Sequence, residues 1–121
     1  DNKHIKFYFL LDNPRSFNFD PEVHLKYIFF KDSQNLNSKF PYFKKTNFKF
    51  SQDQKNIEKY IIHQLSNCPN LKTLKISDFI CSNDNCDVFT NNKFIYKDNN
   101  HLRPFFVVKY LQQPIENFIF D

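Results

Sequence analysis

The chain has 121 residues and contains no glycine, no methionine and no tryptophan. Glycine is the residue that adopts positive φ without a steric penalty and lets a backbone approach a ligand closely. Walker loops, dinucleotide-binding fingerprints and the nucleophile elbow of α/β-hydrolases all need glycine at fixed places. The missing glycine therefore argues against nucleotide-dependent enzymes and against α/β-hydrolases.

Cysteine is scarce and is not clustered. Cys68, Cys81 and Cys86 include no CxxC pair, and structural zinc sites usually need four ligands at tight spacing. We therefore predict no metal and no cofactor, and we expect reduced thiols in an intracellular protein. The sequence also lacks an apolar run near the ~20 residues of a membrane span, so we expect no membrane partner. The net charge of +4 permits an anionic partner without requiring one.

Phenylalanine is abundant instead, with 17 copies, which predicts an aromatic-rich core in one domain of ordinary size. Residues 5–11 read as a strand closed by the turn Asp12-Asn13-Pro14, and residues 46–50 as a short strand. Alternating apolar residues favour a further strand over residues 23–29. Asp20 and Pro21 would also suit a helix start, as N-cap and first residue. We favour the strand.

The following residues read as a capped helix. Ser51-Gln52-Asp53-Gln54 is a capping box, in which Ser51 and Gln54 satisfy each other's exposed amides. Apolar residues then recur on one helical face, and Pro69 ends the helix near Asn67. Residues 71–76 predict a short strand, and Ser77 caps a brief second helix.

Towards the C-terminus we predict a hairpin, a helix and a strand. Asn91-Asn92 is the available substitute for an Asn-Gly turn, because Asn tolerates left-handed φ. Asp98-Asn99-Asn100 is expected to cap a helix over residues 101–112. Pro114 is expected to end that helix, and residues 115–120 to form the last strand.

Without the hairpin, the elements predicted from Ser51 onwards follow the order helix, strand, helix, helix, strand. Residues 57–69 (IEKYIIHQLSNCP) and 74–79 (LKISDF) resemble the winged helix of the middle subunit of replication protein A and of its telomeric counterpart in the CST complex. Phe79 departs from the aliphatic residue of that family. The telomeric counterpart has an insertion where residues 81–100 lie here, and the composition suits an A/T-rich protist genome.

The resemblance implies that residues 51–121 form a winged-helix-like three-helix unit with a small antiparallel sheet and an insertion at about 82–100. Residues 1–50 lie outside the resemblance, and we expect them to form a β-rich segment of unassigned type. The expected fold class of the whole chain is α+β. The implied function is a non-catalytic protein-docking module of a telomere, telomerase or replication complex in the nucleus, with other protein subunits as partners and weak binding of single-stranded DNA.

A second resemblance leaves an alternative open. Residues 65–77 are similar to one leucine-rich repeat of the F-box type, which would make the chain an adaptor or assembly subunit with no nucleic-acid role. Such repeats need about three or more copies to bury their faces, and the sequence has no second copy.

Candidate catalytic residues are not evident. His24, His63 and His101 are isolated in the sequence and read as surface or capping residues, while Asp53 and Glu58 near a helix start read as partners of its dipole. We therefore expect no catalytic residue and no enzyme.

Two segments are candidate binding sites. Basic groups interleaved with aromatic rings suit single strands, because bases stack on rings while ammonium groups meet phosphates. The candidates for nucleic-acid binding are Lys39, Tyr42, Phe43, Lys44, Lys45 and Lys49. An apolar third helix suggests a partner-docking face, with the candidates Arg103, Phe105, Phe106, Lys109 and Tyr110.

Overall fold

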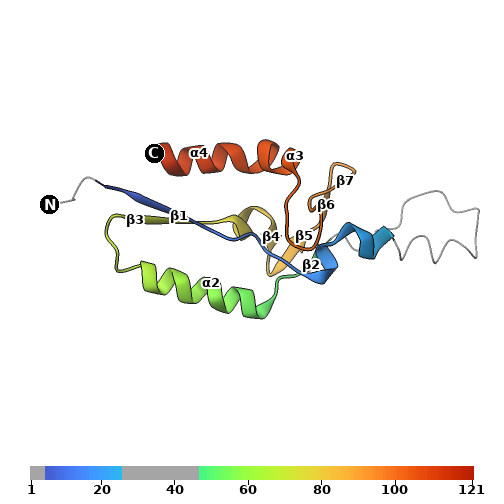
Figure 1. The fold of residues 1–121 in the computed structure, drawn as a ribbon, viewed down its shortest axis with the longest axis horizontal. Coiled ribbons are helices and arrows are strands. Elements are labelled where there is room, and N and C mark those ends of the chain that lie inside the picture. Colours follow the sequence, from blue (N-terminus) through green and yellow to red (C-terminus); the bar gives the residue numbers. More distant parts are fainter. Residues whose placement is uncertain (1–4, 26–46) are drawn as a thin grey trace, which may run out of the picture.

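A computed structural model describes residues 5–25 and 47–121, and it has mixed α+β structure, as predicted (Figure 1). Two strands pair in parallel at its centre: β1 (Phe7–Leu11) and β3 (Leu71–Lys75), in a register that places Phe7 opposite Leu71 and Leu11 opposite Lys75. Helix α2 (Gln52–Leu65) lies on one side of this pair and α4 (Gln112–Phe120) on the other. This is the usual way to cover both faces of parallel strands.

Helix α2 begins where the sequence predicts. The Ser51 hydroxyl accepts a hydrogen bond from the Gln54 amide (3.5 Å), and the helix stops at Leu65, four residues before Pro69. Strand β3 follows and leads into η2 (Ile76–Phe79), a 3-10 turn in place of the predicted brief helix. The predictions of the first strand, this helix and the strand after it are confirmed, because each depends on signals within a few residues.

Small antiparallel sheets lie beside the parallel pair. Strand β5 (Asn85–Asp87) pairs with both β2 (Asn47–Lys49) and β4 (Cys81–Ser82). Strands β6 (Phe89–Thr90) and β7 (Lys93–Phe94) form the predicted hairpin. Asn91 and Asn92 take φ of 47° and 59° at its turn, so asparagine does supply the left-handed residues that glycine would otherwise provide.

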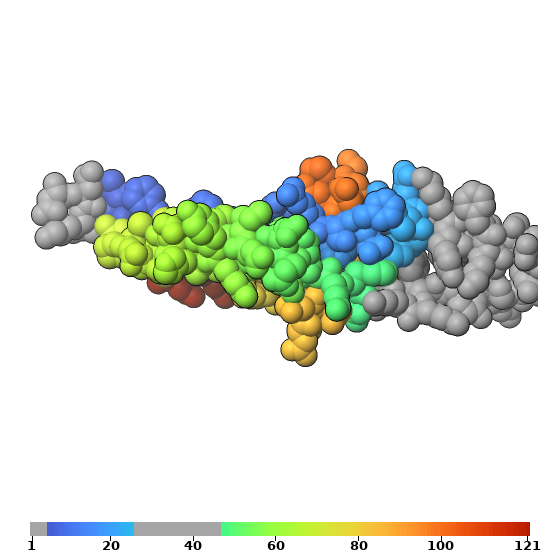
Figure 2. Space-filling model, turned by 90° about the horizontal axis from the view of Figure 1, so that it is seen from below, coloured from blue at the N-terminus to red at the C-terminus, as the bar shows by residue number. Residues whose placement is uncertain are grey.

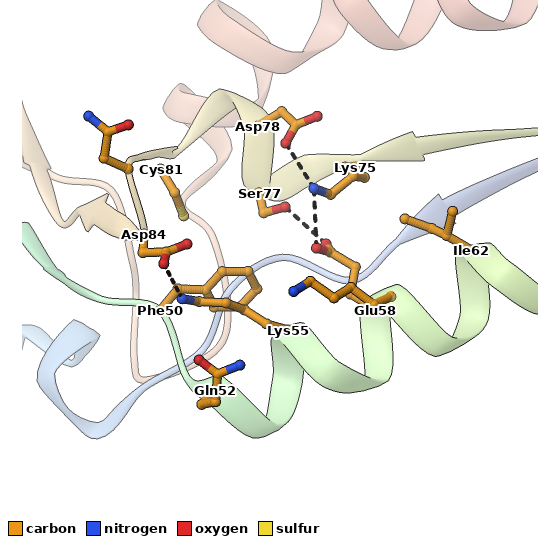
Figure 3. Close-up of a pocket in the computed structure, with 12 residues that line it drawn as sticks. Phe50, Gln52, Lys55, Glu58, Ile62, Lys75, Ser77, Asp78, Cys81 and Asp84 are labelled. Carbon is orange, nitrogen blue, oxygen red and sulfur yellow. Dashed lines mark hydrogen bonds and ion pairs between the residues drawn. The ribbon is translucent and has the colours of Figure 1, made fainter.

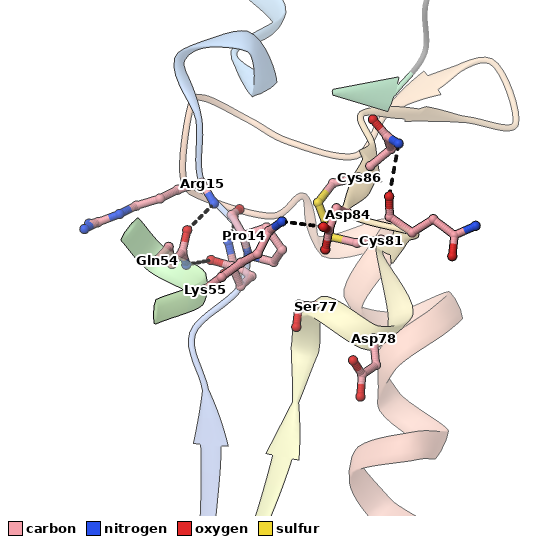
Figure 4. The surroundings of a disulfide bond; sticks show 12 residues. Pro14, Arg15, Gln54, Lys55, Ser77, Asp78, Cys81, Asp84 and Cys86 are labelled. Atoms are coloured by element: carbon pink, nitrogen blue, oxygen red, sulfur yellow. Dashed lines mark hydrogen bonds and ion pairs between the residues drawn. A yellow bond between two sulfur atoms is a disulfide. The ribbon is translucent and has the colours of Figure 1, made fainter. Parts of the chain in front are cut away.

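The prediction of reduced thiols is wrong for two of the three cysteines. Cys81 and Cys86 lie opposite each other in the β4–β5 hairpin and form a disulfide, while Cys68 is free and exposed (Figure 4). The turn between them contains two residues with positive φ, Asn83 and Asp84. That tight turn brings the two cysteines together, and a search for CxxC pairs could not detect it.

The C-terminal prediction is also wrong in two respects. The helical region begins with α3 (Pro104–Phe106) rather than at residue 101, continues through the π-helical η3 (Val107–Leu111), and enters α4 without a break. Residues 115–120 are thus helical and form no strand. Pro114 falls in the first turn of α4, after the wider π turns, where its missing amide and its ring cause less conflict than in a regular helix.

Residues 21–25 are helical rather than extended, which corrects the favoured reading of that segment. The Asp20 carboxylate accepts a hydrogen bond from the Glu22 amide (2.9 Å), so Asp20 is the N-cap and Pro21 the first residue of the helix. The local start signal prevails over the alternation of apolar residues. The rest of the predicted strand lies outside the described residues.

The core gathers residues from both halves of the described chain. Phe19, Val88, Ile95 and Tyr96 are at most 1% exposed, and they form one buried cluster with the residues Phe50, Ile76, Ile80, Cys86, Phe106 and Leu111. The Tyr96 hydroxyl donates a hydrogen bond to the carbonyl oxygen of Pro14 (2.7 Å). This contact fixes the segment after β1 to a residue 82 positions later in the chain.

We predict that the Cys81–Cys86 disulfide stabilises the fold modestly. It closes a short loop, with a sequence separation of 5, and the loop-entropy relation then gives about 2 kcal/mol. Reductant should lower the free energy of unfolding of the wild-type protein by that amount in chemical denaturation. The variant Cys81→Ala/Cys86→Ala should not respond to reductant, whereas Cys68→Ala should respond like the wild type. Equal stability of the wild type with and without reductant would contradict the prediction.

Candidate functional site

The Asp98 carboxylate accepts three hydrogen bonds at the surface. Its Oδ1 accepts hydrogen bonds from the backbone amides of Asn100 (2.9 Å) and His101 (2.8 Å). Its Oδ2 accepts one from Nδ1 of the His101 ring (2.8 Å). The bond from the His101 amide, with those from the Asn100 amide and the His101 ring, lowers the pKa of Asp98 to about 2. Asp98 is therefore ionised at any pH near neutrality.

This contact defines the state of the His101 ring. An ionised carboxylate only accepts hydrogen bonds, so Nδ1 of His101 must carry the proton. In the neutral ring the other nitrogen, Nε2, then holds a free lone pair. The His101 side chain is 72% exposed, and in the described part of the chain no serine hydroxyl is hydrogen-bonded to it. The arrangement is an oriented imidazole with an open, basic nitrogen.

The turn that carries this pair is held by its neighbours. The side-chain amide of Asn13 donates to the carbonyl of Asn100 (2.7 Å), and the Ser16 amide donates to the carbonyl of Asn99 (3.2 Å). The Lys97 amide donates to the carbonyl of His101 (2.7 Å), which closes the turn at its base. The backbone of residues 98–101 is thus fixed from two sides.

The location of the turn is informative as well. Residues 12–16, which hold it, directly follow the carboxyl end of β1. In open sheets with parallel strands, ligands bind beyond the carboxyl ends of the strands. The Asp98–His101 pair therefore lies at the edge of the sheet where such folds place their chemistry.

A second polar cluster lines a pocket of about 330 Å³ between α2 and the end of β3 (Figure 3). The carboxylate of Glu58, which is only 7% exposed, accepts a hydrogen bond from the Ser77 hydroxyl (2.9 Å) and pairs with the Lys75 ammonium group (3.4 Å). Lys75 also pairs with Asp78 (3.2 Å). Glu58 therefore joins α2 to the sheet, which differs from the predicted role at the helix dipole.

The predicted nucleic-acid site is mostly outside the described residues, which include only Lys49 of that set. Lys49 is exposed at the end of β2. The predicted docking residues lie at different depths. Phe106 is 3% exposed and belongs to the core, and Arg103 donates from Nε to the carbonyl of Tyr96 (2.9 Å).

The outer members of the docking set are Phe105, Lys109 and Tyr110. Phe105 and Tyr110 are half-buried, while Lys109 is exposed and lies over the ring of Tyr110. A docking role for them stays a prediction.

Sequence reasoning did not identify Asp98 and His101 as a candidate site. Asp98 was expected to cap a helix, and it does accept the amides of a turn, but Leu102 then forms an isolated bridge with Tyr96 instead of entering a helix. His101 was expected to be a surface or capping residue, not a base. The signal was the Asp-x-x-His spacing, since a capping carboxylate can also reach a histidine ring three residues later.

Two further observations concern metal ions and membranes. The described residues contain no group of three or more His, Cys, Asp and Glu side chains that could hold a metal ion. Among residues 5–25 and 47–121, no helix is long and apolar enough to cross a membrane.

Comparison with known proteins identifies a family. The model of the SGNH domain, described as fused to AT3 domains, matches residues 2–112. No curated protein and no solved structure matches the chain. SGNH domains are a hydrolase-type family with an esterase- or lipase-like fold.

This match overturns three predictions: the winged helix of the replication protein A or telomeric type, the absence of an enzyme, and the assignment to telomeres and DNA binding. The winged-helix order depended on a last strand at residues 115–120, which are helical. The expectation of no enzyme came from treating the histidines as isolated residues, whereas His101 is hydrogen-bonded to Asp98. Since the match covers most of its length, the chain belongs to the family of SGNH domains described as fused to AT3 domains.

Proposed function

We propose that His101 is the general base and general acid of a serine-type hydrolytic site that cleaves esters, and that Asp98 is the carboxylate that orients its ring. The observation that carries this proposal is the hydrogen bond of 2.8 Å between His101 Nδ1 and Asp98 Oδ2 on an exposed, backbone-fixed turn. Serine hydrolases on unrelated folds use the same relation between a carboxylate and a histidine. Membership of a hydrolase-type family supports the assignment.

The chemistry follows from the roles of the two groups. Nε2 of His101 takes the proton of a serine hydroxyl as the serine oxygen forms a bond to the ester carbonyl carbon. The ring, now an imidazolium, is stabilised by the Asp98 carboxylate and gives its proton to the departing alcohol when the ester bond breaks. Water, activated by the same nitrogen, then releases the acid and restores the serine.

The serine nucleophile belongs outside the described residues in this proposal. Ser77 is 3% exposed, and its hydroxyl donates a hydrogen bond to Glu58. The Ser66 hydroxyl donates a hydrogen bond to the carbonyl of His63 (2.7 Å). Ser51 and Ser16 accept amide hydrogen bonds at the starts of α2 and η1 (Phe17–Phe19). The remaining described serine, Ser82, is exposed in β4. In the described part of the chain, none of these hydroxyls is hydrogen-bonded to the His101 ring.

The first test is hydrolysis of a short aryl ester, such as p-nitrophenyl acetate, by the intact native protein. His101→Ala and Asp98→Asn should each lower kcat by about 10³-fold or more, because the base is either removed or left in the wrong tautomer. Circular dichroism should show an unchanged fold, because both side chains lie at the surface.

The matched control is His63→Ala, which removes an exposed histidine from α2 and should leave kcat unchanged. A fluorophosphonate reagent should label a serine of the wild-type protein and label it more slowly in His101→Ala. Hydrolysis by His101→Ala at the wild-type rate would refute the proposed function.

A second prediction concerns stability at acid pH. The pKa of Asp98 is lowered on folding to about 2, so the carboxylate favours the folded state above its unfolded pKa, and this contribution disappears as the pH falls towards 2. The difference in unfolding free energy between wild type and Asp98→Asn should be constant above about pH 5 and should shrink between about pH 4 and pH 2.

The measurement is chemical denaturation at several pH values. Asp84 needs a separate control, because its hydrogen bond and charge interaction with Lys55 also lower its pKa. The experiment should therefore be repeated in an Asp84→Asn background. A difference between wild type and Asp98→Asn that does not change with pH would contradict the prediction.

A further inference from the structure

We propose that Gln54 is a positioning residue for the Asp98–His101 pair and acts through the loop after β1. This inference rests on the proposed function and adds to it a residue of α2 that touches neither member of the pair. The route has two steps, from Gln54 to residues 13–15 and from residues 13–16 to the turn at residues 98–101.

In the first step, the Gln54 side chain binds the loop after β1 instead of completing the expected capping box. Ser51 accepts the Gln54 amide, but the Gln54 side chain does not bond to the amide of Ser51 as the motif predicts. Instead, its Nε2 donates to the carbonyl of Asn13 (2.8 Å) and its Oε1 accepts from the amide of Arg15 (2.9 Å). Figure 4 shows this side chain between the start of α2 and the loop at Pro14 and Arg15.

The second step joins the same loop to the turn that carries the pair. Asn13 uses its side-chain amide to bind the carbonyl of Asn100, and Ser16 uses its backbone amide to bind the carbonyl of Asn99. These two carbonyls lie between Asp98 and His101 in the sequence. A shift of the loop would therefore move the peptide groups whose amides orient the Asp98 carboxylate.

The side chain of glutamine suits this role for a definite reason. One carboxamide satisfies a carbonyl and an amide that lie two residues apart in the loop, so it fixes both position and direction. Glutamate would keep the acceptor for Arg15 but could not donate to Asn13. Figure 2 shows the start of α2, in green, directly beside the blue segment that contains this loop.

The main experiment compares Gln54→Met with Gln64→Met in the intact native protein. Methionine keeps the length of the side chain and removes both hydrogen bonds, and Gln64 is an exposed residue of the same helix. Gln54→Met should lower kcat for the aryl ester about 10-fold with KM unchanged, because a small misplacement of a catalytic group reduces the rate without loss of substrate contacts. Gln64→Met should match the wild type.

A second measurement reports on the pair itself and needs no activity. The proton on Nδ1 of His101 should give a downfield NMR signal at low temperature in the wild type, because it is hydrogen-bonded to Asp98. This signal should broaden or disappear in Gln54→Met and persist in Gln64→Met. A role of Gln54 in helix stability alone would lower the melting temperature and leave the signal intact below it.

A double substitution tests the route. If Gln54 acts through Asn13, the variant Gln54→Met/Asn13→Ala should lose little more activity than the more damaging single variant, whereas independent effects would multiply. Multiplying effects, or a Gln54→Met protein with wild-type kcat and a wild-type His101 signal, would overturn the inference. If Gln54→Met does not fold, Gln54→Glu replaces it, since an acid in the first turn of a helix favours folding.

The two proposals can fail separately. If His101→Ala hydrolyses the ester at the wild-type rate, the proposed function fails. The His101 signal then decides alone whether Gln54 positions the pair: a signal that survives in both Gln54→Met and Gln54→Glu refutes positioning, and a signal lost in both supports it.

Discussion

The structure depends on the buried hydrogen bond from the Tyr96 hydroxyl to the carbonyl of Pro14. Both residues are less than 2% exposed, and burial raises the pKa of the Tyr96 phenol above its ordinary value, so the hydroxyl stays protonated and donates. A buried phenol needs such a partner, and so does a buried carbonyl. The bond fixes the loop at the carboxyl end of β1 to the segment that precedes Asp98. The same loop also contacts the turn at residues 98–101 through Asn13 and Ser16.

The features that the sequence predicted correctly are those whose causes are local. Strand β1, helix α2 and the Asn91-Asn92 turn each follow from a pattern or cap within a few residues. The features it missed depend on distant or less common geometry. The π turns before Pro114 let the helix continue, and the two left-handed residues of the β4–β5 turn bring Cys81 to Cys86. Neither follows from counting prolines or CxxC pairs.

The sequence predicted one of the two parts of the candidate site. The capping tendency of Asp98 was recognised, and the carboxylate does accept two backbone amides. The error lay in treating the cap as the start of a helix and His101 as its first residue. Tyr96 instead pairs with Leu102 in a short bridge, so the chain after the turn runs back towards the core. The His101 ring remains at the surface beside the Asp98 carboxylate that orients it.

A comparison of Glu58 with Asp98 illustrates why one carboxylate is structural and the other belongs to the candidate site. Glu58 is buried, and its two oxygens are occupied by Ser77 and Lys75, so its contacts join α2 to the sheet. Asp98 is ionised because of backbone hydrogen bonds rather than an ion pair with a lysine. Its carboxylate orients the His101 ring, which remains exposed. A carboxylate fixed by the backbone keeps its charge without a deep pocket, and the histidine beside it keeps one nitrogen free to take a proton. That difference, rather than burial or conspicuous charge, makes the Asp98–His101 pair the candidate site of this chain.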